Sequence, residues 1–133
     1  MEEIGILSTI NIGDVFASSK KITEHDVKTF ADLSGDHNPL HLDAKFASTS
    51  MFKQRVAHGM LTASLISAAL ASITGTVILT YVCFSFEKPV YMGDTLTARV
   101  VVVNVEGSKV NLNAEVLRGT ERVLSGTVKI LRK

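Results

Sequence analysis

The feature that most constrains the fold is the stretch from Met60 to Ile73, which predicts a helix with apolar side chains around nearly its whole circumference. A helix of this kind is buried on most sides. We expect it to begin near His58-Gly59 and to run to about Ile73, with Gly75 as its C-terminal stop. Serine and threonine interrupt the stretch, and it is shorter than the roughly 20 apolar residues of a membrane span. The sequence therefore predicts a core helix and no contact with a membrane.

The residues after this helix predict a sheet. Valine, leucine, isoleucine and threonine dominate with partial alternation, and they predict four strands, at 76–86, 95–105, 109–117 and 122–131. Short connections that contain Gly107 or Gly119 join the last three strands, so we expect antiparallel hairpins. Such a sheet can curl around the apolar helix and bury it, which predicts an α+β domain.

One of the predicted strands contains the run Val100-Val101-Val102-Val103. An edge strand that is this apolar would be an aggregation hazard if it were left open. We therefore expect two copies of the chain to pair their sheets edge to edge and form a homodimer.

The first half of the chain predicts helices and loops. A short extended segment at 14–18 is followed by a helix that has Thr23 as its N-cap, acidic residues in its first turn and Gly35 at its end. We expect residues 34–41 to form a loop, because Pro39 biases Asn38 away from helical backbone angles. Residues 43–47 predict a further short turn of helix.

The composition indicates a single domain over residues 1–133, with 46% hydrophobic and 20% charged residues. Lysine and arginine total 14 against 13 acidic residues, a net charge of +1, which argues against nucleic acid as a main partner. Cys83 is the only cysteine, so we expect a buried packing thiol, no intrachain disulfide and a reducing compartment. The start Met1-Glu2-Glu3-Ile4 lacks the features of a signal peptide, so the expected location is cytoplasmic.

A carboxylate, an amide and two imidazoles gather in one segment, Ser34-Gly35-Asp36-His37-Asn38-Pro39-Leu40-His41. A carboxylate near an imidazole can activate a water by general acid–base catalysis near neutral pH. The same residue types also form ordinary turns, so the segment taken alone leaves that interpretation open. Zinc binding by His37 and His41 is disfavoured, because Pro39 prevents a continuous helix from placing both on one face. We expect no metal.

A second feature is Val56-Ala57-His58-Gly59-Met60 at the head of the apolar helix. A helix N-terminus exposes unpaired N–H groups and the positive end of the helix dipole, so it stabilises an oxyanion. Gly59 would let a ligand approach the backbone closely, although taken alone it is better explained as a simple helix start. We expect His58 to be a packing or hydrogen-bonded histidine, and Ser67 to bond back to a carbonyl of its own helix.

Together these segments resemble the MaoC-like dehydratases, specifically the single-domain R-specific enoyl-CoA hydratases. The matching residues are Phe30 to Asp43, Phe46-Ala47 and Val56 to Leu61, and the segment from Phe86 to Asp94 is also similar. The resemblance covers nearly the whole chain. It implies a hot-dog fold, in which an antiparallel sheet wraps a long central helix, together with a homodimer and no cofactor.

By position, the resemblance assigns Asp36 and His41 to water activation, Asn38 to support of their loop, and the Gly59 N–H to the thioester oxygen. It also places Ser67 near the pair. The implied reaction is reversible hydration of a trans-2-enoyl-CoA to an (R)-3-hydroxyacyl-CoA.

Three alternatives remain open at this point: a thioesterase on the same fold, a 3-hydroxyacyl-acyl-carrier-protein dehydratase, and a non-catalytic acyl-thioester binding module. A thioesterase needs one carboxylate, so the second group, His41, favours a hydratase. A pure binder has no reason to keep ionisable groups whose burial costs desolvation. The residues do not distinguish CoA from an acyl carrier protein as the thioester handle.

Overall fold

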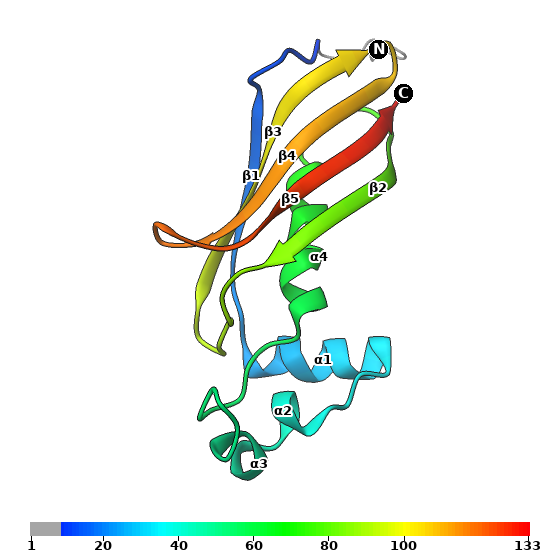
Figure 1. The fold of residues 1–133 in the computed structure, drawn as a ribbon. Helices are drawn as coiled ribbons and strands as arrows, with labels where there is room; N and C mark the ends of the chain where they lie inside the picture. Colours follow the sequence, from blue (N-terminus) through cyan, green and yellow to red (C-terminus); the bar gives the residue numbers. More distant parts are fainter. Residues whose placement is uncertain (1–8) are drawn as a thin grey trace.

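A five-stranded sheet packs one face against a central helix in the computed structural model, which describes residues 9–133 (Figure 1). All strand pairs are antiparallel, in the order β1-β3-β4-β5-β2. The strands are β1 Val15–Lys21, β2 Val77–Phe86, β3 Thr95–Glu106, β4 Lys109–Arg118 and β5 Glu121–Arg132. The predicted α+β hot-dog architecture is confirmed. The start of the chain, on which the expectation of no signal peptide depends, lies outside the described residues.

The helices of the described part are α1 Glu24–Ser34, α2 Pro39–Leu42, α3 Ala44–Ser48 and α4 Gly59–Leu70. α4 packs along β1, β3 and β4, whereas α1, α2 and α3 lie beyond its N-terminal end (Figure 1). Aliphatic side chains from both layers, among them Leu65, Ile66, Leu112 and Val128, form the buried core. Within residues 9–133, no helix has the length and apolar character that a membrane crossing requires.

α4 begins at Gly59, as predicted, but it ends at Leu70 and not near Ile73. The N–H groups of Ser72 and Ile73 bond to carbonyls three residues back, so the chain tightens into turns before Gly75. The predicted burial on most sides is also incomplete. One face of the helix is exposed, along a stripe formed by Met60, Ser64, Ser67 and Ala68. The sheet of a single chain therefore does not close over α4.

The predicted open edge at Val100–Val103 is wrong, because β3 lies between β1 and β4. The pairing of β1 with β3 joins segments about 80 residues apart, which local patterns do not reveal. The free edges of the sheet are β1 and β2. β2 is the apolar one: its exposed side chains include Leu79 (53%), Val82 (44%) and Phe86 (52%).

Cys83 is exposed, so the prediction of a packing thiol is wrong. In the pairing of β2 with β5, Val82 lies opposite Val128 and Cys83 lies opposite Thr127. Val128 is buried in the core, and side chains alternate between the faces of a strand. Val82 therefore points to the helix side of the sheet, and Cys83 points to its outer face.

α1 has the predicted caps. Thr23 accepts a hydrogen bond from the Asp26 N–H and the Asp26 carboxylate accepts one from the Thr23 N–H, while Gly35 ends the helix with a φ of 83°. The loop that follows is shorter than predicted, because Pro39 begins α2 and His41 lies on that helical turn. Proline is compatible with the first position of a helix, and Asn38 has non-helical angles, as we expected before proline.

Gly126 on β5 lies where β2 approaches too closely for a side chain. A Cβ there would overlap the carbonyl oxygen of Cys83 and would lie 2.7 Å from a ring carbon of Phe84. We expect Gly126→Ala to lower the free energy of unfolding by about 1–3 kcal/mol or more, because the backbone of β2 must shift. Thr127→Ala, at the exposed neighbouring position, should change it by less than about 0.5 kcal/mol. Urea denaturation measures both, and unchanged stability of Gly126→Ala would contradict this close approach.

Candidate active site

Asp36 follows directly on the glycine that ends α1. Its N–H donates to Oγ of Ser34 at 3.1 Å, and its Oδ1 accepts the N–H of Asn38 at 3.2 Å. Asn38 makes the same kind of bond to the residue two positions later: its Oδ1 accepts the N–H of Leu40 at 3.1 Å. Such local bonds are the reason that Asp and Asn favour turns. These bonds order the turn, and the one from Asn38 holds the half-exposed Asp36 carboxylate in place.

His41 faces Asp36 from the turn of α2. Its Nδ1 lies 2.7 Å from the carbonyl oxygen of Val56. A carbonyl only accepts, so Nδ1 carries the proton and Nε2 has a free lone pair in the neutral ring. Nε2 lies 4.0 Å from Oδ2 of Asp36. That separation is too long for a direct hydrogen bond, but one water molecule can bridge it.

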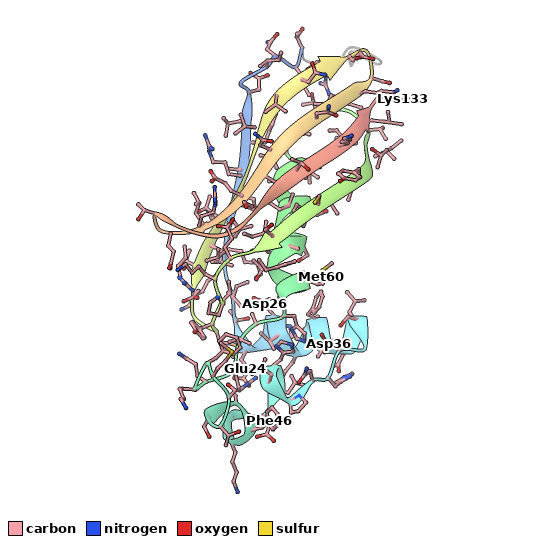
Figure 2. The ribbon with its side chains drawn as sticks, viewed as in Figure 1. Glu24, Asp26, Asp36, Phe46, Met60 and Lys133 are labelled. Atoms are coloured by element: carbon pink, nitrogen blue, oxygen red, sulfur yellow. The ribbon has the colours of Figure 1, made fainter. Side chains whose placement is uncertain are left out.

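The N-terminus of α4 forms the second part of the site. Figure 2 shows Asp36, beside α1, below Met60, in the first turn of α4. His58 is the N-cap residue, but its side chain makes no capping hydrogen bond. The N–H groups of the first turn, beginning with Gly59, have no intrahelical partner, as at any helix N-terminus, and the side chain of His58 does not supply one. They present the positive end of the helix dipole.

The N-terminal end of α4 and His41 both line one cavity of about 350 Å³. Most of its lining is apolar, from residues that include Leu40, Phe52, Val56, Phe86, Val90 and Val123. A mainly apolar cavity with a few polar groups is typical of a small-molecule site. A Cβ at Gly59 would lie 3.3 Å from two ring carbons of Phe86, so a larger residue would crowd this wall.

Two further residues hold the loop, and neither was predicted from the sequence as a site residue. Arg55 donates through Nε to the carbonyl oxygen of His41 at 2.8 Å, and its Nη1 pairs with Glu24 at 2.9 Å. His58 donates through Nε2 to the carbonyl oxygen of Asp36 at 3.0 Å, which confirms the predicted hydrogen-bonded histidine. No local pattern could have identified Arg55, because its partners lie 14 and 31 residues away.

Ser67 lies apart from these residues. It is on the exposed stripe of α4, about 12 Å along the helix axis from Gly59, and it does not line the cavity. Asp36, His41 and Gly59 are thus brought to one end of the sheet, whereas Ser67 faces the uncovered side of the helix.

Asp36, His41 and His58 offer ligand atoms within 4.8 Å of one another, a possible metal-binding group. His37, whose pairing with His41 on zinc the sequence disfavoured, bonds to Asp32 at 3.1 Å, and this bond raises the pKa of His37. The rings of His41 and His58 stack with centroids 3.9 Å apart and planes inclined by 30°. Because Nε2 of His58 donates to the Asp36 carbonyl, that nitrogen carries a proton and offers no lone pair to a metal ion.

Comparison with known proteins identifies the family. The MaoC like domain matches residues 9–123. An (R)-specific enoyl-CoA hydratase of Rhodospirillum rubrum is 41% identical over 102 residues, which cover 75% of this chain and 71% of that protein. A 3-hydroxybutyryl-CoA dehydratase of Methylorubrum extorquens is 35% identical, with 93% and 83% covered. The structure of the (R)-hydratase of Aeromonas caviae matches with a TM-score of 0.88 and 33% identity, over 94% of this chain and 98% of that one. This chain belongs to the MaoC-like domain family.

Proposed function

We propose that this protein catalyses the reversible hydration of a trans-2-enoyl-CoA to an (R)-3-hydroxyacyl-CoA. The observation that carries the proposal is that His41 lines the cavity together with the uncapped start of α4, while the Asp36 carboxylate, outside that lining, lies 4.0 Å from Nε2 of His41. The relatives named (R)-specific enoyl-CoA hydratase and 3-hydroxybutyryl-CoA dehydratase support this reaction and its R configuration.

The chemistry follows from the free atoms of the site. A 2-enoyl thioester is electrophilic at C3, and a water held between Asp36 and His41 would give a proton to Nε2 of His41 as its oxygen bonds to C3. The electrons of the double bond then move toward the carbonyl, and charge develops on the thioester oxygen. The N–H of Gly59 and the dipole of α4 would stabilise that charge because they are already oriented. His41 then returns the proton to C2, and the reverse sequence is dehydration.

We further propose that the active form is a homodimer joined through β2. The free edge of β2 has unpaired backbone groups, and Leu79 and Val82 are exposed on the helix side of the sheet, beside the uncovered stripe of α4. A second β2 strand would extend the sheet and cover this apolar surface. Ser67 would then lie in the interface, and any contact it makes with substrate would depend on the dimer.

The remaining proposals concern organisation and location. We propose that residues 1–133 act as one MaoC-like hot-dog domain, which is supported by the match to residues 9–123. The single cysteine supports a reducing compartment, and we place the enzyme in the cytoplasm.

We expect the protein to hydrate a short- or medium-chain trans-2-enoyl-CoA without added metal or cofactor, which is measured as loss of the enoyl thioester's ultraviolet absorbance. Asp36→Asn and His41→Ala should each lower kcat by at least about a hundredfold, because each removes one of the groups that hold the water. The double variant should lose much less than the product of the two effects, since residues that act as a unit are not additive.

His37→Ala is the matched control, because His37 lies in the same loop but its ring nitrogens bond to Asp32 and to the Gly35 carbonyl. Its kcat should stay close to that of the wild type, and circular dichroism should show the same fold for all variants. A thiol reagent detects released CoA, and rapid release without hydration would identify a thioesterase instead. Activity that is lost with a chelator and restored by zinc would contradict the metal-free mechanism.

Gly59→Pro tests the oxyanion donor, because proline has no N–H. Proline is tolerated at the first position of a helix, and His58 already has the φ of −59° and ψ of 137° that suit a residue before proline. Gly59→Ala is the matched control, since its Cβ meets the same Phe86 ring but the donor remains. We expect kcat of the proline variant to be about 10²–10³-fold below that of the alanine variant. Equal values in folded proteins would exclude this N–H from the oxyanion site.

Val82→Glu should convert the homodimer into a monomer, because it places a charge on the surface that a second β2 would cover. Val82 is 44% exposed and Val103 is 40% exposed, but β4 and β5 separate Val103 on β3 from β2. Val103→Glu is therefore the matched control and should remain dimeric. Light scattering at micromolar concentration measures the mass, and a monomeric wild-type protein would contradict the proposed interface.

A further inference from the structure

His58 belongs to the start of α4 and also bonds to the loop of Asp36. Its main chain leads directly into Gly59 at the head of α4, while its side chain reaches the loop that carries Asp36. Nε2 lies 3.0 Å from the carbonyl oxygen of Asp36, 22 residues away in the chain. Because His58 is only 1% exposed, solvent does not compete for this bond.

The hydrogen-bond partners of His58 define its protonation state. The Asp36 carbonyl only accepts, so Nε2 carries a proton. Nδ1 is buried and has no hydrogen-bond partner among the described residues, so a proton there would be an unpaired buried donor. Burial also lowers the pKa of His58. The ring is therefore a neutral donor, and it does not compete with His41 for a proton.

The same ring packs against His41. The two imidazoles stack with centroids 3.9 Å apart, and Phe30 contacts His58 with a centroid distance of 4.9 Å. His41 is also held at Nδ1 by the carbonyl of Val56 and at its own carbonyl by Arg55. These contacts leave Nε2 as the unconstrained atom of the His41 ring, on the side of Asp36.

We propose that His58 is a positioning residue that sets the distance between the water-activating pair and the oxyanion donor, by bonding to the Asp36 carbonyl while its own backbone begins α4. The proposal rests on the proposed hydration. Addition of water requires the nucleophile at C3 and the N–H at the thioester oxygen at the same moment, so the two parts of the site must be held in one geometry. A displacement of about 1 Å between such groups is enough to cost on the order of a hundredfold in rate.

Two variants separate the donor of His58 from its ring. His58→Gln can place an amide N–H where Nε2 lies but has no ring, and His58→Phe keeps a ring but has no donor. We expect His58→Phe to lower kcat by about 10–100-fold with little change in KM, and His58→Gln to stay within about fivefold of the wild type. If the ring only filled space, phenylalanine would be the better substitute. A smaller loss of kcat in His58→Phe than in His58→Gln, or equal losses in both folded variants, would overturn the proposal.

Nitrogen-15 NMR of the histidine rings gives a readout that needs no turnover and no variant. In the wild-type protein at neutral pH, we expect His58 as the Nε2–H tautomer and His41 as the Nδ1–H tautomer. An Nδ1–H tautomer of His58 would overturn the inference even if neither variant folded. A protein that showed both expected tautomers but hydrated no enoyl-CoA would refute the proposed function, while the link between His58 and Asp36 would stand.

Discussion

The packing of α4 against the inner face of the sheet is the contact on which the rest of the structure depends. The helix offers Leu61, Leu65 and Ile66 to the core, and β1, β3 and β4 hold it along its length. The segment that leads into it is also fixed, because the N–H of Ala57 bonds to the carbonyl of Val90 at 2.7 Å. A helix N-terminus stabilises charge efficiently only if its direction is set before the reaction. Burial of α4 provides that condition.

Backbone groups form much of the candidate site. The carbonyl of Val56 selects the tautomer of His41, the carbonyl of Asp36 receives the neutral His58, and the N–H of Gly59 points from the helix end. The side chains of His41 and Asp36 differ in their exposure to solvent. His41 is enclosed at 12% exposure and lines the cavity, whereas the carboxylate of Asp36 reaches solvent at 50% exposure.

The exposed stripe of α4 and the apolar side chains of β2 have a common cause. α4 packs mainly against β1, β3 and β4, so the sheet leaves both the far side of the helix and the strand at its edge uncovered. Aliphatic side chains such as Leu79 and Val82 then lie at a free edge, where water contacts them. A surface with these properties is stable in water when a matching surface covers it. The homodimer that we propose thus follows from the position of the helix.

The features that the sequence determined by itself depend on near neighbours in the chain. The N-cap at Thr23, the start of α4 at Gly59 and the hairpins between the last strands were all predicted from such local patterns. The loop at 34–41 was singled out in the same way, and the resemblance to the family then selected Asp36 and His41 within it. Only the tertiary structure decided that β3 is internal, that Cys83 faces outward, and that Arg55 and His58 hold the loop of Asp36 and His41. The bonds that tie the Asp36–His41 loop to the rest of the protein join residues 14–22 positions apart. Local preferences do not encode contacts of that separation, because they form only when the buried helix and the sheet bring distant segments together.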